Sequence, residues 1–558
     1  MDQSVPMNGS LARKIEGNTT TEDAVYLALN NELIASQICF HSMPTIGADK
    51  HTFTILARTC RGLHLPAIVE IWRNLHGLAP LVMTMPNNCW EIAEPNEINA
   101  YQRSIRFIRP ISMDDCHRFR FYAKFVHSYH TGTRLPAGDA SVYESLYLVM
   151  KEHGEICLLP NLETLGWNTQ LDSTFPFFTT LLHPYLKDIR ITFKDKQCRL
   201  DSVKDIAIRC PKLRGVVLRS SDDHTGIAAV SSAYPVLENL DSFSITALST
   251  AAYLQLVEHP SLTELSIQNL ATVDWTLVES RPQNFPSFPR LRKILLGPSK
   301  METILHAFKF IDQPPLREIG LVTNDNQGGS AWGHLIRLIS ATAAGNFHQL
   351  EELYFNDKGP LSIDPAVLLG PLTPEHFQPL FSFKHLAEVE IHTYCPIMID
   401  DQCIQRLAES WPNLKRLALH LLKNTLDPEY YPPKNTIHSL IHFATNCPSL
   451  SILSLAFDAR NPRLPDHTLG NSISSKLSIL SIQCSPIGDS QIVAAIFSDW
   501  FPQLNGVMCG GFLPMEDRKK WITVSAWLPL LRKVRMQERA SNFGRGTLGL
   551  QSQSEAGS

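Results

Sequence analysis

From about residue 156 to residue 540, apolar residues recur in one short pattern, P-x-L-x-x-Φ-x-Φ, in which Φ is apolar. The pattern reads CPKLRGVVL at 210–218, WPNLKRLAL at 411–419 and CPSLSILSL at 447–455. Because side chains alternate between the two faces of a strand, the final Φ-x-Φ predicts a short strand with both apolar residues on one face. Helical runs such as DQCIQRLAES at 401–410 precede many copies, and the proline ends each helix just before the strand.

Fourteen copies of the pattern follow one another, and eleven of them keep the proline. The first and last prolines, at 160 and 529, lie thirteen intervals apart, so a repeat has about 28 residues, a length typical of leucine-rich repeats. A single helix–strand unit cannot bury its own apolar face, whereas stacked units share a core. We therefore predict an α/β leucine-rich-repeat solenoid with parallel strands on its concave face. The alternative is a set of ordinary α/β domains with coincidental P-x-L sequences.

Three intervals between copies are longer, at 34 to 36 residues. The additional residues lie in 324–330, 359–374 and 426–433, which are rich in Gly, Pro or polar residues. These insertions are either binding loops or tolerated drift of the repeat length.

The residues before the repeats have a mainly helical pattern. Phe53, Leu56, Ala57 and Cys60 recur at helical spacing, and 119–126 form another apolar helix. We expect a small all-α module at 22–80, a helical linker at 81–155 and the solenoid at 156–540. The polar, aperiodic ends, 1–21 and 541–558, are expected to be disordered tails.

Composition narrows the possible partners. The 558 residues include 50 basic and 54 acidic side chains, a net charge of −4, and no run of Lys and Arg, which argues against nucleic acid or an anionic membrane as the main partner. The N-terminus has no apolar signal segment, and no stretch approaches 18 consecutive apolar residues. The twelve cysteines are scattered without C-x-x-C spacing. We interpret them as mostly buried, reduced thiols, and expect a cytoplasmic or nuclear protein.

No motif points to catalysis, a metal or a cofactor. Cys116, His117, His127 and His130 suggest a metal cluster, with His127 and His130 on one face of a helix, but no acidic residue or second pair completes a site. We interpret them as a partly exposed helix surface. The segment 544–549 matches G-x-G-x-x-G, but it lies in a polar tail without the preceding strand and following helix that phosphate binding requires. We therefore expect no catalytic residues, metal or cofactor.

Surface recognition remains as the chemistry of the repeats. In each copy, the residue between the last two apolar positions and the residue after them are expected on the concave face. Three successive copies place an aromatic ring and several hydrogen-bonding groups there: Tyr354, Asn356, Glu390, His392 and His420. Such mixtures are typical of contact hot spots, so we predict that these residues bind a protein substrate. The alternative is a solvated face without a partner.

Two segments of the N-terminal region resemble an F-box. LNNELIASQICF at 29–40 resembles its first half, and TFTILARTCRGLHLPAIVEIWRNLHGLAPLV at 52–82 resembles its second half more closely. The run RFRFYAKFV at 118–126, after Arg109-Pro110, is similar to a linker helix of the same group. The chain resembles the F-box proteins of mushroom-forming fungi, which also carry degenerate leucine-rich repeats. An F-box normally begins Leu-Pro, where this chain has Leu29-Asn30.

This resemblance implies the substrate-recognition subunit of a cullin-type ubiquitin ligase. The F-box would dock on the Skp adaptor of the cullin complex, and the repeats would hold an unidentified protein substrate. The implied adaptor contacts or F-box core residues are Leu33, Ile34, Ile38, Leu56, Ile68 and Trp72. The alternatives are a helical cap on the first repeat and a protein-binding scaffold without a role in ubiquitin transfer.

Overall fold

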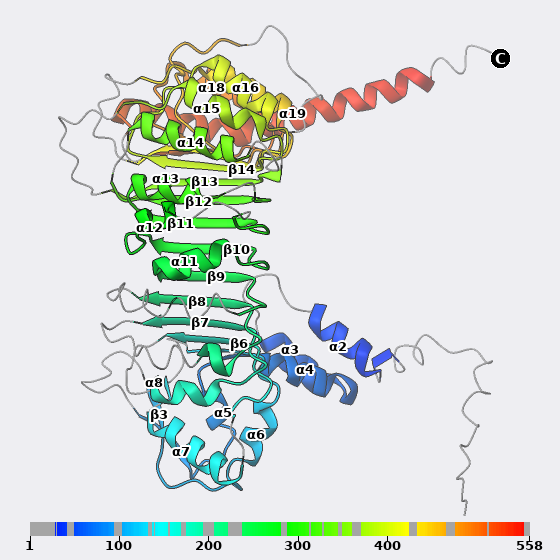
Figure 1. The fold of residues 1–558 in the computed structure, drawn as a ribbon. Helices are drawn as coiled ribbons and strands as arrows, with labels where there is room; N and C mark the ends of the chain where they lie inside the picture. Colours follow the sequence, from blue (N-terminus) through cyan, green and yellow to red (C-terminus); the bar gives the residue numbers. More distant parts are fainter. Residues whose placement is uncertain are drawn as a thin grey trace, which may run out of the picture. The chain divides into compact units, whose positions relative to one another are not determined.

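The structure is a computed structural model of the whole chain (Figure 1). It describes residues 28–29, 31–41, 50–93, 103–131, 137–138, 140–154, 157–168, 175–193, 206–220, 231, 237–280, 287–311, 314–325, 328–343, 349–359, 370–422, 432–464, 475–510 and 513–551. The predicted N-terminal tail and most of the insertions at 359–374 and 426–433 lie outside these residues, whereas of the insertion at 324–330 only 326–327 lie outside them. The chain divides into two compact units, Met1–Ser221 and Asp222–Ser558.

The first unit begins with helices and continues into parallel strands. Its helices are α2 (Glu32–His41), α3 (Lys50–Thr59), α4 (Arg61–Arg73), α5 (Ala79–Val82), α6 (His117–Ala123), α7 (Ala140–Glu152), α8 (Phe175–Phe178) and the 3-10 helix η2 (Thr179–Leu181). Five strands pair in the order β1 (Asn74–His76), β4 (Ser128–His130), β6 (Thr164–Asn168), β7 (Asp188–Phe193) and β8 (Gly215–Ser220), all parallel. A separate small sheet joins β2 (Trp90–Ala93), β3 (Ser104–Phe107) and β5 (Ala137–Gly138).

In the described part of the second unit there are ten strands, whose spatial order follows the chain. They are β9 (Ser242–Ala247), β10 (Glu264–Asn269), β11 (Lys293–Ser299), β12 (Glu318–Thr323), β13 (Glu352–Asp357), β14 (Glu388–Thr393), β15 (Arg416–Leu421), β16 (Ile452–Ser454), β17 (Ile479–Gln483) and β18 (Val507–Cys509). All nine pairings between neighbours are parallel. Parallel strands in chain order, joined through helices, confirm the predicted α/β solenoid of leucine-rich-repeat type.

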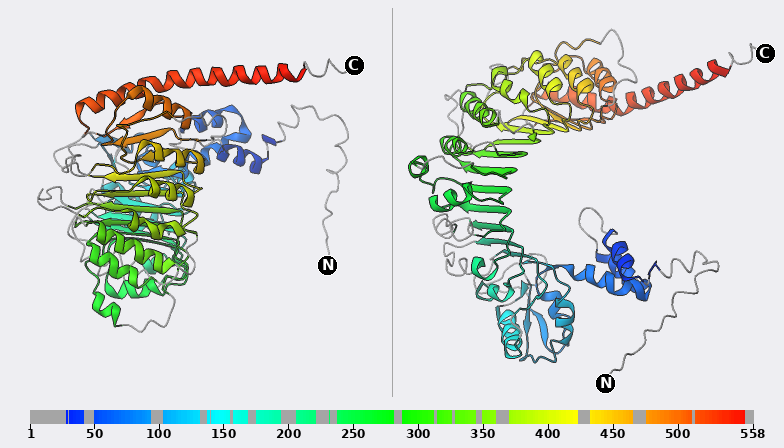
Figure 2. Two further views of the ribbon diagram at one scale, coloured as in Figure 1. Left: turned by 90° about the horizontal axis from the view of Figure 1, so that it is seen from above. Right: turned by 45° about the vertical axis from the view of Figure 1, so that its right-hand side comes forward.

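Helices connect these strands on one side, as Figure 2 shows for the second unit. They are α11 (Thr250–Val257), α12 (Trp275–Glu279), α13 (Met301–Lys309), α14 (Gly329–Ala343), α15 (Pro374–Phe377), η4 (Gln378–Ser382), α16 (Asp401–Ser410), η5 (Ile437–Leu440), α17 (Ile441–Asn446), α18 (Ser490–Trp500) and α19 (Met515–Gln551). Several helices begin at a polar cap: the side chains of Ser249, Asp400 and Asp489 accept hydrogen bonds from the first turns of α11, α16 and α18. The strand face opposite the helices is called the open face below.

The core is a ladder of apolar side chains built from the repeat pattern. The first Φ position of each repeat forms one continuous row across the second unit: Phe243, Leu265, Ile294, Ile319, Leu353, Val389, Leu417, Leu453, Leu480 and Val507. The first nine are at most 1% exposed. Burying one such side chain stabilises the fold by about 1.5–3 kcal/mol, so the row explains why the pattern keeps its apolar positions.

Thirteen of the fourteen predicted repeat strands are present, and the prediction of the fourteenth is wrong. LPLLRKVRM at 528–536 lies inside α19, which contains Pro529. Trp521, Val524 and Leu528 recur at helical spacing and are buried, so the helical period overrides the proline signal here. Helix α19 packs on β18, where Ser525 Oγ accepts from Val507 N at 3.1 Å, and it therefore covers the last strand.

Other differences lie before the array and at its end. The parallel sheet already begins with β1 and β4, in residues that we predicted to be helical. His130 is on β4 and not on a helix, because α6 stops at Ala123. Helix α19 continues to Gln551, past residue 541 where we expected a tail, and 544–549 lie within it. Residues 552–558 lie outside the described part of the chain.

Candidate functional site

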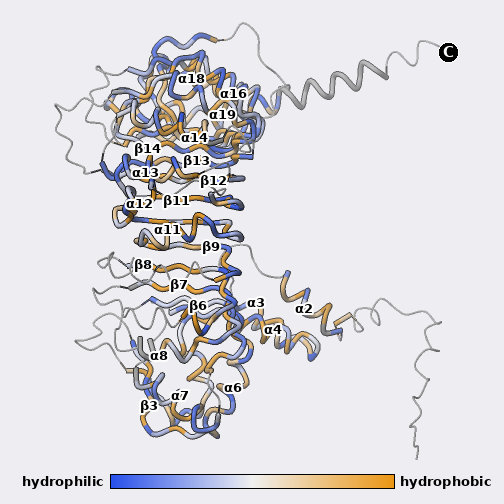
Figure 3. The backbone as a smooth tube through the Cα atoms, viewed as in Figure 1, coloured by the Kyte–Doolittle hydropathy of each residue, from blue (hydrophilic) through white to orange (hydrophobic). Residues whose placement is uncertain are grey.

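Helix α2 presents large apolar side chains to solvent. Leu33 is 79% exposed, Ile34 42%, Ile38 37% and Phe40 51%. Orange segments run along this helix in Figure 3. The opposite side of α2 is buried in a small core that α2, α3 and α4 share: Ala35, Cys39, Phe53, Ala57, Leu63 and Ala67. The helix is therefore apolar on both sides, and one side has no covering among the described residues.

An asparagine cap starts this helix. Asn31 Oδ1 accepts hydrogen bonds from the backbone N–H groups of Leu33 at 3.0 Å and Ile34 at 3.3 Å. Capping of this kind stabilises a helix by about 1 kcal/mol. Asn31 thus orders the start of α2. The preceding Asn30, which stands where the F-box resemblance has a proline, lies outside the described residues. We did not single out Asn31 from the sequence, although an Asn just before an apolar helical run is a known start signal.

The six residues that the F-box resemblance implies fall into two groups. Leu33, Ile34 and Ile38 are exposed. Leu56 and Ile68 are partly buried against the small core of the three helices. Trp72 stacks on Tyr122 of α6, with ring centroids 4.8 Å apart and an angle of 23° between the planes. The second group packs the module, so of the six residues only those on α2 are exposed for contact with a partner.

The five predicted substrate-binding residues meet on the open face of β13, β14 and β15. Asn356, His392 and His420 stand in one register row, and Tyr354 pairs with Glu390 in the next. The rings of His392 and His420 stack with centroids 4.8 Å apart, and the Tyr354 ring is 5.8 Å from His392. Asn356 Nδ2 donates to the Tyr354 hydroxyl at 2.7 Å, and Glu390 Oε2 lies 3.3 Å from His392 Nε2. The residues therefore form one continuous polar and aromatic surface.

The electrostatics of this surface depend on an arginine that we missed. Arg416 Nε lies 3.4 Å from a carboxylate oxygen of Glu388 and 3.4 Å from one of Glu390.

Burial, and then the neighbouring His392, lower the pKa of His420. His420 is consequently neutral at physiological pH and can both donate and accept a hydrogen bond.

A row of charged residues runs along the N-terminal ends of β10 to β15, which include the three strands of this surface. The register aligns Glu264, Lys293, Glu318, Glu352, Glu388 and Arg416 across β10 to β15. Lys293 Nζ lies 2.6 Å from Glu318. Burial raises the pKa of Glu352, and the adjacent carboxylates of Glu318 and Glu388 raise it further. The surface thus combines charges with rings and hydrogen-bonding groups, which suits contact with protein side chains.

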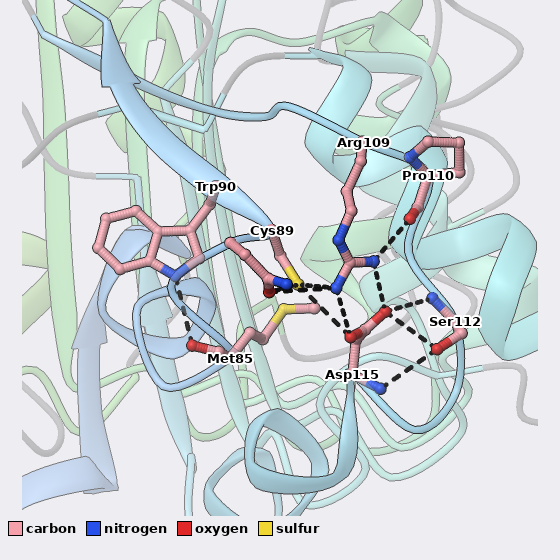
Figure 4. Close-up of polar contacts among 8 residues, drawn as sticks. Met85, Cys89, Trp90, Arg109, Pro110, Ser112 and Asp115 are labelled. Atoms are coloured by element: carbon pink, nitrogen blue, oxygen red, sulfur yellow. Dashed lines mark hydrogen bonds and ion pairs between the residues drawn. The ribbon is translucent and has the colours of Figure 1, made fainter.

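A second polar cluster in the first unit holds the linker together (Figure 4). The Arg109 guanidinium donates to both carboxylate oxygens of Asp115, at 2.8 and 2.9 Å, and to Cys89 Sγ at 2.8 Å. Ser112 N donates to the same carboxylate at 2.8 Å. Burial and the Asp115 carboxylate raise the pKa of the Cys89 thiol, which is fully buried. A protonated, buried thiol is not a nucleophile, so we assign this cluster a structural role.

Metal and membrane sites were sought within the described part of the chain. There, no group of three or more His, Cys, Asp or Glu side chains is placed to hold a metal ion. No helix of these residues is long and apolar enough to cross a membrane.

Comparison with known proteins found similarity among solved structures. No family model matches the chain, and no curated protein matches it. A chain from the solved structure titled "Crystal structure of Rad7 and Elc1 complex in yeast" has a TM-score of 0.39 and 14% identity, over 68% of this chain and 86% of that chain. The solenoid assignment rests on the order and register of this chain's own strands.

Proposed function

We propose that the chain is the substrate-recognition subunit of a cullin-type ubiquitin ligase. Its F-box-like helices would dock on the Skp adaptor, and its strands would hold a protein substrate. The observation that carries this proposal is the exposed apolar side of α2, in a segment whose sequence resembles an F-box. A helix that only capped the first repeat would bury its apolar side chains instead.

The exposed side of α2 offers apolar side chains whose burial would favour association. Fully burying a Leu, Ile or Phe side chain contributes about 1.5–3 kcal/mol. Leu33 and Phe40 are more than half exposed and Ile34 and Ile38 more than a third, so a docked partner gains most from the first two. The small core under α2 keeps these side chains on one rigid surface.

Such a receptor performs no chemistry itself. The open face of β13–β15 would hold the substrate, and adaptor docking would raise its effective concentration near the ubiquitin-charged enzyme. The proposal includes no catalytic residue, metal or cofactor, and it implies a cytoplasmic or nuclear location.

Co-purification with the Skp adaptor tests the proposal. The full-length chain should bind the adaptor, and the double variant Leu33→Ser/Ile34→Ser should lose binding while its circular dichroism spectrum stays unchanged. Leu277→Ser is the matched control, because Leu277 is 57% exposed on α12 in the second unit. Absence of binding by the wild-type chain, or equal binding by all three proteins, would contradict adaptor docking.

The second candidate function is a protein-binding scaffold without a role in ubiquitin transfer. Contacts that tie the helical module to its own unit favour it: Trp72 stacks on Tyr122, and Lys50 Nζ donates to the Asn74 carbonyl at 3.1 Å. On this hypothesis, the α2 double variant leaves the cellular lifetime of the bound protein unchanged. A longer lifetime in cells carrying that variant would exclude the scaffold.

A further inference from the structure

The open face of the first unit has a chemistry unlike that of the second. Three rows of side chains cross its parallel strands, two of them over all five strands and the third over β6, β7 and β8. They are Asn74, Ser128, Thr164, Asp188 and Gly215; His76, His130, Gly166, Arg190 and Val217; and Asn168, Thr192 and Arg219. The alternating residues Leu75, Tyr129, Leu165, Ile189 and Val216 are buried in the core, at most 1% exposed. The three rows therefore face away from the core, and most of their side chains are hydrogen-bond donors.

The middle row places two imidazole rings and a guanidinium group around a glycine. The rings of His76 and His130 stack with centroids 5.8 Å apart, and Arg190 stands two strands from His130, across Gly166. His130 leans over Gly166 so closely that a Cβ there would lie 2.0 Å from His130 Nδ1. His130 Nε2 is 3.0 Å from Ser128 Oγ. Glycine is thus required at 166 for the imidazole to lie flat against the strands.

Positive charge on this face exceeds negative charge. Arg190 and Arg219 are exposed, while Asp188 is the one carboxylate in the three rows. Asp188 leans toward β8, because its Oδ1 lies 2.2 Å from where a Cβ of Gly215 would be. Burial lowers the pKa of His130, and the neighbouring His76 and Arg190 lower it further. Burial and the nearby Arg190 guanidinium therefore disfavour protonation of His130, and an anion on this face would oppose that effect.

We propose that the open face of β4, β6, β7 and β8 binds an acidic segment of a partner protein. Arg190 and Arg219 would each pair with a Glu or Asp carboxylate, and His130, Ser128 and Thr164 would supply further hydrogen bonds. Arginine suits carboxylates because its planar fork donates two parallel hydrogen bonds. The rows contain no Phe, Tyr or Trp on which bases could stack, which favours an acidic protein over a nucleic acid.

Peptide binding to the full-length chain tests this assignment. The probe is a fluorescent, glutamate-rich peptide, with a glutamine-for-glutamate peptide of equal length as the neutral control. The glutamate peptide should bind, should weaken as salt is added, and should bind more tightly than the glutamine peptide. Equal binding of the two peptides, or no binding of the glutamate peptide, would overturn the proposal.

Single charge removals locate the site. Arg190→Gln should weaken peptide binding about threefold to fivefold, and Arg190→Gln/Arg219→Gln about tenfold or more, since an exposed charge pair contributes up to about 1 kcal/mol. Arg209→Gln is the matched control, because it removes the same charge from an exposed position. Arg209 lies before β8 and outside the three rows. If Arg209→Gln weakens binding as much as Arg190→Gln, the site is refuted.

Two further measurements separate this site from other possibilities. The first is binding of a single-stranded oligothymidylate. If it binds through the same arginines more tightly than the peptide, the partner is a nucleic acid and the proposal of an acidic protein is wrong. The α2 variant Leu33→Ser/Ile34→Ser should bind the peptide like the wild type, because the face does not depend on adaptor docking. Loss of peptide binding in that variant would contradict the proposed position of the site.

Discussion

Trp521 offers the sharpest test of how the C-terminal end of the second unit is stabilised. Its side chain on α19 is fully buried. The indole stacks on Phe497 of α18 with centroids 6.2 Å apart, and its edge meets Phe457 at 5.9 Å. Its Nε1 donates to the Ser485 carbonyl at 2.9 Å. One side chain therefore joins α19 to the last repeats by both packing and a hydrogen bond.

The expected loss on Trp521→Ala follows from these contacts. Truncating a buried Trp to Ala costs about 3–5 kcal/mol in free energy of unfolding. The Ser485 carbonyl also loses its donor, so we expect the upper end of that range, about 5 kcal/mol. Trp521→Phe keeps most of the ring contacts and loses the donor, which should cost about 1–2 kcal/mol.

Urea denaturation followed by circular dichroism measures these differences. The control is Trp527→Ala on the same helix, because Trp527 is 39% exposed and should cost less than about 1 kcal/mol. If Trp521→Ala does not fold, Trp521→Phe still distinguishes the two positions. Equal losses for Trp521→Phe and Trp527→Ala would refute the view that α19 closes the unit through Trp521.

Three further predictions concern polar contacts that are partly or fully buried. The adjacent Arg109 guanidinium and a backbone N–H hold the pKa of Asp115 well below its usual range. The contribution of Asp115 to the stability of the fold is therefore present above about pH 4 and is lost as the pH falls below that. Asp115→Asn should make stability depend less on pH in this acid range, and an unchanged pH profile of unfolding would argue against this. The Gln483 carboxamide donates to the Leu419 carbonyl and accepts from Leu421 N. Gln483→Ala should therefore lower the free energy of unfolding by about 1–2 kcal/mol and speed hydrogen exchange of the Leu421 amide. Unchanged exchange at Leu421 would contradict the contact. The Tyr143 hydroxyl lies 2.8 Å from that of Tyr129, and burial raises the pKa of Tyr143 to about 12. Tyr143→Phe should therefore cost about 1–3 kcal/mol, and adding Tyr129→Phe should restore part of that loss in a double-mutant cycle; two independent losses would exclude the pair.

The repeat pattern predicted the array because its signals are local and recur. Template leucines such as Leu213, Leu414 and Leu450 are at most 1% exposed, and the alternating Φ-x-Φ became a strand in thirteen of the fourteen copies. The strands β1 and β4 were missed because neither NLH nor SYH follows a P-x-L sequence. Three-residue strands carry too little periodicity to be recognised alone, and it is the register with β6 that reveals them.

The candidate substrate surface was predicted in part. The strand alternation placed Tyr354, His392 and His420 on one face, and they lie in contact there. Arg416 was missed although the same alternation, taken one step earlier in its strand, puts it on that face. Its pairing with Glu390 depends on how long side chains lean across neighbouring strands, which no sequence period encodes.

The strand order of the second unit has a consequence for synthesis on the ribosome. Within the second unit, each strand from β10 to β18 pairs with the strand made just before it, so every new repeat finds a folded edge on which to add. At about 5–20 residues per second, a repeat of about 28 residues emerges in a few seconds, and each edge stays unpaired for about that time. Helix α19 is translated after β18 and covers it, so it ends the exposure of a growing edge that would otherwise invite aggregation of nascent chains.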